Sequence, residues 1–346
     1  MNIKTYGTDH ITTYKLKINN YNIMLDFNGD NLKKQDVEDL DFIFISHEHL
    51  DHCGSLINYD LIKYLNKKVR IFATETTKNI INYLLTNKMT KQGYNKTPLE
   101  EINNLLNKIE IVIFKKEIKI DDNFSFIFYR SGHTFGSSMI YLKSSQYNLL
   151  YTGDMDYVEN DINRQYDVPY NLHVDYLIID GSNILDDDFK GVNIANVRSY
   201  INRRKPGEIV YYHAREEKAI FYALTLANKV DDAVFIYPKS MKWYIELLAN
   251  QQYDVFINNK IVLDTDFFEI QEDRVNVKFT LNDKQYSINN RLSLHITKNE
   301  IINFIESHLS NTPSKIYIGH YYIPDNYNNE LPLENSILLK LGDNNE

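Results

Sequence analysis

The apolar positions in the first half of the chain come in short runs separated by polar turns, a pattern typical of strands alternating with helices. Residues 11–18 and 21–27 predict a hairpin that turns at Asn19-Asn20. Further strands are expected at 41–46, 69–74, 109–114, 124–130, 138–143, 148–151 and 176–180. Helices are expected at 55–65, at 77–85 and after Pro98.

The second half of the chain follows a different pattern. From 192 to 250, helical segments alternate with apolar strands, which predicts a parallel α/β unit. A strand at 291–296, a helix at 298–309 and a strand at 315–322 follow. We therefore expect a first segment at 1–185, an inserted unit at 186–285, and a return to the first domain at 286–346.

Composition places the chain among ordinary globular proteins. Of its 346 residues, 43% are hydrophobic and 25% charged, which argues against a disordered or collagenous protein. No apolar run approaches the roughly 20 residues that a transmembrane helix needs, and the N-terminal segment lacks the apolar stretch of a secretion signal. The single cysteine, Cys53, excludes an internal disulfide framework and favours a reducing compartment. We expect a cytoplasmic protein with no membrane partner.

The net charge of the whole chain is −9, from 38 basic and 47 acidic residues. This balance argues against a protein that coats nucleic acid with its entire surface. The net charge does not exclude a basic groove on one part of the surface.

The strongest local signal for chemistry, Ser46-His47-Glu48-His49-Leu50-Asp51-His52, comes at the end of the apolar strand at 41–46. In an extended segment alternate side chains share a face, so His47 and His49 are expected to point the same way. A following turn can bring Asp51 and His52 into the same small volume. Imidazole and carboxylate suit zinc, and also manganese. The segment therefore predicts ligands for two adjacent divalent ions rather than a solvated polar loop.

Two ions need more ligands than this segment supplies. His133, Asp154 and His320 each follow a predicted strand, and each has a glycine directly before it. Glycine lets the backbone come close to a crowded site. Taken alone, each of the three is more simply explained as an ordinary loop residue. Together they complete a set of seven ligands that suits two metals if Asp154 bridges them: His47, His49, Asp51, His52, His133, Asp154 and His320.

These motifs, in this order, resemble those of the metallo-β-lactamase superfamily. They are most similar to the β-CASP nucleases, the group that includes ribonuclease J and the endonuclease that cleaves pre-mRNA 3′ ends. The matching segments are ISHEHLDHCGSL, SGHTFGSSMIYL, LLYTGDMDY, LIIDGSNI, RLSLHITKNEIINFI and IYIGHYY. The resemblance implies an α/β protein with the four-layer αββα metallo-β-lactamase fold and a small inserted α/β cap.

The resemblance also implies roles for the ligands. The first metal would be held by His47, His49 and His133, the second by Asp51, His52 and His320, with Asp154 between them. A hydroxide between the ions would be the nucleophile, since zinc can lower the pKa of bound water to about 7. Zinc is the first choice of metal and manganese the alternative.

Two further residues are assigned by the resemblance. Asp180 occupies the acidic motif after the strand at 176–180, and His295 opens the helix at 298–309. A carboxylate beside an imidazole favours its protonated form, and a protonated His295 can donate to the leaving oxygen as general acid. The alternative is a structural pair at a domain seam.

The inserted unit gathers positive charge and aromatic residues. Basic side chains can track phosphates and aromatic faces can stack on unpaired bases, which suits RNA or single-stranded DNA. The alternative is that the aromatics belong to the core of the unit and the charges to a solvated helix face. Candidate substrate contacts are Arg215, Arg291 and Ser293. The insertion is shorter than in β-CASP relatives.

The favoured interpretation is a two-metal phosphodiesterase, a ribonuclease that also admits single-stranded DNA as substrate. The first alternative is a metallo-hydrolase of a small ester, lactone or phosphodiester that uses the same dinuclear site. The second is an inactive scaffolding subunit, which the complete set of seven ligands disfavours. The sequence leaves homo-oligomerisation open.

Overall fold

The structure, a computed structural model, describes most of the chain in separate ranges. They are 1–8, 10–88, 98–156, 167–185, 194–213, 230, 232–237, 242–250, 261–263, 270–280, 295–321, 333, 335–340 and 344–345. The chain divides into two units. One consists of Met1–Val158, Gln165–Asp187 and His295–Glu346, and the other of Glu159–Arg164 and Asp188–Leu294.

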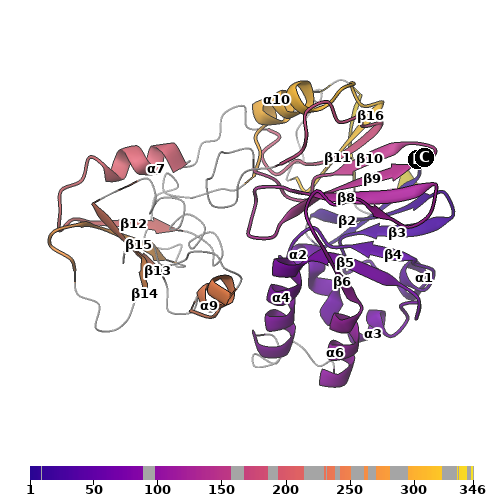
Figure 1. The fold of residues 1–346 in the computed structure, drawn as a ribbon, viewed down its shortest axis with the longest axis horizontal. Helices are drawn as coiled ribbons and strands as arrows, with labels where there is room; N and C mark the ends of the chain where they lie inside the picture. The colour runs from indigo at the N-terminus through magenta and orange to yellow at the C-terminus, as the bar shows by residue number, and fades with distance from the viewer. Residues whose placement is uncertain are drawn as a thin grey trace. The chain divides into compact units, whose positions relative to one another are not determined.

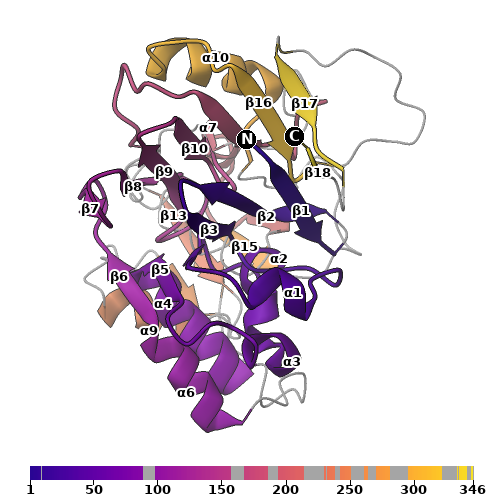
Figure 2. The same ribbon diagram turned by 90° about the vertical axis from the view of Figure 1, so that its right-hand side faces the viewer.

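The first unit contains two seven-stranded sheets. From edge to edge, the first sheet consists of β18 (Asn344–Asn345), β1 (Ile3–Gly7), β2 (Ile11–Ile18), β3 (Tyr21–Leu25), β4 (Phe42–Phe44), β5 (Arg70–Thr74) and β6 (Ile109–Val112). The strands from β18 to β3 pair antiparallel, and those from β3 to β6 pair parallel. The expected hairpin is confirmed, with Ile18 opposite Tyr21 and Asn19 in the left-handed region at φ 52°. Pairing of β18 with β1 brings the two ends of the chain side by side (Figure 2).

The second sheet has a similar mixture of antiparallel and parallel pairs. Its order is β17 (Ser336–Leu338), β16 (Lys315–Gly319), β11 (Tyr176–Asp180), β10 (Asn148–Tyr151), β9 (Ser138–Ser144), β8 (Phe124–Arg130) and β7 (Ile118–Lys119). The strands β10, β11 and β16 are mutually parallel. Their carboxyl ends therefore meet at one edge of the sheet, and the residues that follow them come together there.

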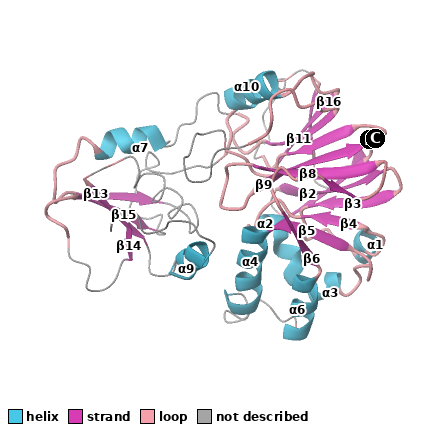
Figure 3. Ribbon diagram, viewed as in Figure 1, coloured by secondary structure: helices cyan, strands magenta, loops and turns pink. Residues whose placement is uncertain are grey.

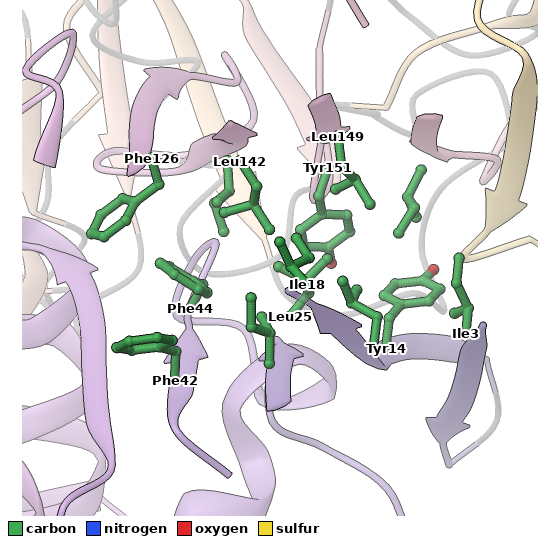
Figure 4. Packing of buried hydrophobic residues seen from close by; sticks show 14 of the residues in the cluster. Ile3, Tyr14, Ile18, Leu25, Phe42, Phe44, Phe126, Leu142, Leu149 and Tyr151 are labelled. Carbon is green, nitrogen blue, oxygen red and sulfur yellow. The ribbon is translucent and has the colours of Figure 1, made fainter. Parts of the chain in front are cut away.

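The main core lies between the two sheets and is rich in aromatic side chains (Figure 4). Phe44 of the first sheet packs edge-on against Phe126 of the second, with ring centroids 4.9 Å apart, and lies beside Phe72 at 5.3 Å. Burial of large apolar side chains from both sheets supplies the main driving force for this association.

Helices cover the outer face of each sheet (Figures 1 and 3). On the first sheet they are α1 (Lys34–Val37), α2 (Leu50–Cys53), α3 (Tyr59–Ile62), α4 (Glu75–Tyr83), continued by a π-helical segment at Leu84–Lys88, and α6 (Leu99–Asn107). On the second sheet, α10 (Lys298–His308) buries Ile301 and Phe304. The order helix, sheet, sheet, helix confirms the predicted αββα arrangement.

The helix expected at 55–65 is not continuous. A 3₁₀ turn at Gly54–Ile57 stops at Asn58, whose ψ of 95° is extended, before α3 begins at Tyr59. The Asn58 side chain accepts a hydrogen bond from the backbone N–H of Asp60 at 3.1 Å. Such local bonding by asparagine competes with helix continuation, which apolar spacing alone does not reveal. The strand expected at 291–296 is also wrong for its described residues, because His295 and Ile296 lie outside any strand.

The described residues of the second unit form a four-stranded sheet in which every pair is parallel. Its order is β12 (Ile209–His213), β15 (Val275–Thr280), β13 (Ala233–Tyr237) and β14 (Ile261–Leu263). The helices α7 (Ile194–Ile201) and α9 (Lys242–Asn250) belong to the same unit. The predicted parallel α/β pattern is therefore confirmed. Within the described part of the whole chain, no helix has the length and apolarity to cross a membrane.

The hydroxyl group of Tyr317 is expected to lower the stability of the main core. It is buried without a hydrogen-bond partner among the described residues. Because an unsatisfied buried polar group is unfavourable, Tyr317→Phe is expected to raise the free energy of unfolding by about 1 kcal/mol. Urea denaturation in the presence of a chelator measures this. Tyr6→Phe is the matched control, since the Tyr6 hydroxyl donates to Asp36 at 2.9 Å and its loss should lower stability. A Tyr317→Phe variant less stable than the wild type contradicts the prediction.

Candidate metal centre

The histidine-rich segment after β4 turns back on itself, as its sequence predicts. His47 is fully buried, and its ring lies 4.6 Å from that of His49 between centroids. The helix α2 begins directly after His49, whose carbonyl accepts hydrogen bonds from the backbone N–H groups of His52 and Cys53. This turn places the His52 ring 4.1 Å from that of His47.

The other three expected ligands come from the ends of β8, β10 and β16. Gly153, before Asp154, has φ 55°, and a Cβ atom there would lie 2.7 Å from the Cβ of Ser46. Glycine is therefore required for β10 to end against the histidine segment. Gly319, before His320, is needed for another reason, because a Cβ atom there would overlap the hydroxyl of Tyr14.

Asp154 lies between two groups of ligands. Its Oδ2 atom is 3.7 Å from His47 Nε2 and 3.5 Å from His133 Nε2. Its Oδ1 atom is 3.1 Å from His52 Nε2 and 2.8 Å from His320 Nδ1. Each carboxylate oxygen thus faces a different half of the site, which is the arrangement expected of a bridging ligand.

The candidate ligand atoms gather tightly in both halves. Those of His47, His49, His133 and Asp154 all lie within 4.8 Å of one another, as do those of Asp51, His52 and His320. All seven expected ligands are therefore brought together. Similar groups that include Asp26 or the pair Asp180 and His295 lie beside them.

The buried polar atoms at the centre fit a pair of divalent ions. The Nε2 atoms of His47 and His52 and both oxygens of Asp154 have no hydrogen-bond partner in the described part of the chain. Burying such groups without partners is costly. Imidazole nitrogens and carboxylate oxygens directed at a common volume are the usual donors for zinc, so the residues present suit the metals that the sequence implied.

The electrostatics of the site favour added positive charge. Burial alone would lower the pKa of His52, but Asp154, Asp26 and Asp51 outweigh it and hold that pKa well above its ordinary value. Burial and the neighbouring rings of His52 and His49 hold the pKa of His47 well below its ordinary value. The carboxylates thus attract a cation, while the neutral imidazole of His47 is the form that binds metal.

Asp26 is a functional candidate that the sequence analysis missed. It follows β3 with φ 58° and is fully buried. Its Oδ2 atom lies 2.7 Å from His52 Nδ1 and accepts a hydrogen bond from Ser46 Oγ at 2.7 Å, while Oδ1 accepts from Ser46 N at 2.6 Å. Tyr151 donates to Oδ2 at 2.5 Å. The signal was available, since Asp26 is an acid at a strand end like the residues that were selected.

Replacing Asp26 tests this supporting role. Metal-binding histidines commonly place their second nitrogen on a carboxylate, and its loss costs about 10–100-fold in metal affinity or activity. We expect Asp26→Asn to weaken zinc binding by that factor in a competition titration with a chromophoric chelator. The exposed Asp30 offers a matched control, and Asp30→Asn should leave zinc binding unchanged. Equal zinc affinity in both variants contradicts the assignment.

The second predicted pair, Asp180 and His295, forms beside the metal ligands. His295 Nδ1 lies 2.9 Å from Asp180 Oδ2, and the His295 ring is 4.7 Å from that of His133. The backbone N–H of Met155 also donates to Asp180, at 3.2 Å. Burial would raise the pKa of Asp180, but the nearby imidazole of His295 outweighs it and lowers that pKa. The pair therefore includes an ionised carboxylate and adjoins the site.

Four residues remain: one that the sequence did not indicate but that lies near the site, and three that the structure does not describe. His10 was not selected from the sequence, yet its ring lies 5.8 Å from that of His320. Arg215, Arg291 and Ser293, the expected substrate contacts, lie outside the described residues.

Comparison with known proteins supports the sequence resemblance. A family model described as a metallo-beta-lactamase superfamily domain matches residues 15–166. An RNase J-like protein from Methanocaldococcus jannaschii is 34% identical over 127 residues, covering 36% of this chain and 28% of that protein. Cleavage and polyadenylation specificity factor 73 of Drosophila melanogaster is 34% identical over 132 residues, covering 36% and 18%. Integrator complex subunit 11 of Danio rerio is 31% identical over 126 residues, covering 34% and 20%. The matched part spans less than a third of the length of each of these relatives.

Among solved structures, one that matches nearly the whole chain shows the likeness of fold. It is a protein of unknown function from Enterococcus faecalis V583, with a TM-score of 0.61, 12% sequence identity and 99% of both chains covered. At this identity the likeness concerns the fold alone.

Proposed function

We propose that this protein is a two-metal phosphodiesterase that hydrolyses RNA. The premise is that residues 15–166 carry a metallo-β-lactamase superfamily domain. The observation that supports the proposal most directly is the position of Asp154, whose two oxygens face separate groups of histidine ligands. The similarity to the protein named RNase J-like supports RNA as the substrate class. Single-stranded DNA is the second substrate that the assay below includes.

The ligands divide into two sets in this proposal. His47, His49 and His133 hold one metal, Asp51, His52 and His320 hold the other, and Asp154 contacts both. Two divalent ions, when bound, polarise a phosphodiester and lower the pKa of water, as zinc does in metallo-hydrolases. Zinc is the metal that this donor set favours, with manganese as the alternative.

His295 is the proton donor to the leaving oxygen in the proposed reaction. Asp180 lies against its Nδ1 atom, which leaves Nε2 as the nitrogen that can donate to a substrate. The His295 side chain retains 16% of its exposure, whereas Asp180 is buried. A partly exposed imidazole that a buried carboxylate orients suits general acid catalysis.

The second unit is proposed as a reduced β-CASP-like cap that binds the nucleic-acid strand. The tyrosines of this unit whose burial the structure describes fall into two groups. Tyr237 and Tyr244 are core residues, as the structural alternative expected, whereas Tyr200 and Tyr211 are exposed at 42% and 38%. The Arg204 guanidinium lies 3.9 Å from the centroid of the Tyr200 ring. Exposed aromatic and basic groups together suit unpaired bases and phosphates.

Metal analysis followed by substrate assays tests the proposal. Purified protein should contain close to two zinc or manganese ions per chain and cleave end-labelled single-stranded RNA. Single-stranded DNA, bis(p-nitrophenyl) phosphate and a small ester are assayed in parallel. No cleavage of either nucleic acid, with turnover of the small ester, overturns the nuclease assignment and favours a small-molecule hydrolase.

A further inference from the structure

The hydroxyl group of Ser182 lies between the general-acid pair and a metal ligand. Ser182 Oγ is 2.6 Å from Asp180 Oδ1, 3.0 Å from His320 Nδ1 and 3.0 Å from the carbonyl oxygen of His320. One small side chain thus contacts residues from the ends of two strands, β11 and β16.

The backbone brings Ser182 to this place. Asp180 pairs with Gly319 across β11 and β16, and the N–H of Gly181 donates to the carbonyl oxygen of Gly319 at 2.8 Å. A Cβ atom at Gly181 would lie 2.5 Å from Ile318 Cγ2, so only glycine allows this approach. The close approach sets the serine hydroxyl directly against the His320 ring.

The backbone of His320 is itself constrained. Its φ of 49° lies in the left-handed region, which is unfavourable for a residue other than glycine. Its N–H donates to the carbonyl oxygen of Ile11 at 2.8 Å, which helps to hold this conformation. The backbone therefore sets where the imidazole lies, but it does not decide which of the two ring nitrogens carries the hydrogen.

The hydrogen-bond donors and acceptors around the His320 ring decide which nitrogen carries the hydrogen. A hydroxyl group has one hydrogen, and its shortest contact is with a carboxylate, which only accepts. Ser182 therefore donates to Asp180 and accepts from His320 Nδ1–H. This contact with Ser182 favours hydrogen on Nδ1. His320 Nε2, which lies 3.4 Å from Asp51 Oδ2, is left with the lone pair.

We propose that Ser182 is a positioning residue that fixes the tautomer of His320 and couples it to the general-acid pair. The same Asp180 carboxylate that accepts from Ser182 through Oδ1 contacts His295 Nδ1 through Oδ2. A continuous series of contacts, His320 to Ser182 to Asp180 to His295, therefore connects the ligands of the second metal with the proton donor. The inference deepens the proposed function, and the part that concerns His295 rests on it.

Zinc titration of the metal-stripped protein tests the positioning of His320 by Ser182. Ser182→Ala removes the acceptor for His320 Nδ1–H and should weaken one of the two zinc-binding steps by about 10–100-fold, leaving the other unchanged. Ser182→Thr keeps the hydroxyl and should bind zinc more tightly than Ser182→Ala. The matched control is Ser314→Ala, because Ser314 precedes β16 at the end opposite His320 and its hydroxyl donates to the Asp175 carbonyl oxygen at 2.8 Å. Wild-type affinity at both steps in Ser182→Ala overturns the proposal.

A spectroscopic readout on the wild type does not depend on the folding of any variant. In the zinc-loaded protein, ¹⁵N–¹H correlation spectra of the histidine rings should show His320 protonated at Nδ1. Protonation at Nε2 overturns the proposal whatever the variants do. Neither measurement uses RNA. Weakened zinc binding in Ser182→Ala without RNA cleavage by the wild type therefore counts against the nuclease function alone.

Discussion

Asp154→Asn is expected to bind at most one zinc ion tightly and to lose RNA cleavage by about 10³-fold or more. The physical reason is the position of the carboxylate, whose oxygens face both groups of ligands. Metal ions contribute several kcal/mol of transition-state stabilisation, and each 1.36 kcal/mol corresponds to a factor of about ten in rate. Asparagine has the same shape but no charge, so it offers one weaker oxygen where two ions need a shared anionic ligand. Elemental analysis and single-turnover cleavage of end-labelled RNA measure the two effects.

Asp60→Asn is the matched control for this substitution. Asp60 is exposed at the start of α3, and its carboxylate pairs with Lys63 at 2.5 Å. The control should retain two ions and wild-type cleavage. Two tightly bound zinc ions in Asp154→Asn contradict the bridging role, even if cleavage is lost.

His295→Ala should slow RNA cleavage by about 10²–10⁴-fold, the usual contribution of a general acid, while the metal content stays near two ions. The sugar oxygen that leaves from RNA needs a proton, whereas p-nitrophenolate leaves readily without one. The same variant is therefore expected to turn over bis(p-nitrophenyl) phosphate at close to the wild-type rate. The ratio of the two rates separates loss of the proton donor from damage to the metal site.

His173→Ala is the control, because His173 is exposed and its nearest carboxylate, Asp175, lies away from the metal ligands on the strand connection before β11. It should leave both rates unchanged. Equal slowing of both substrates in His295→Ala, or no slowing of either, contradicts the assignment of His295 as general acid. Equal slowing with fewer bound ions instead assigns His295 to the support of the metals.

The sequence by itself determined the elements and the chemistry that is local to them. The hairpin at 11–25 and the helix α10 follow from apolar period and turn or capping residues, which act over a few positions. Four of the seven ligand candidates share the polar segment after one apolar run and the other three each follow a later run, and parallel strands bring such ends to a common edge.

The tertiary structure decided what depends on contacts between distant strands. Asp26 is an acid at a strand end, but its role and that of Ser182 follow only from the atoms opposite them, His52 Nδ1 and His320 Nδ1. The division of Asp154 between two sets of histidines is likewise a matter of distances that no spacing encodes. Local periodicity reflects the geometry of one element, whereas the direction of a hydrogen bond between elements is set by their packing. The sequence therefore determined which side chains are available for metal chemistry, and the packing of the two sheets decided which atoms they present.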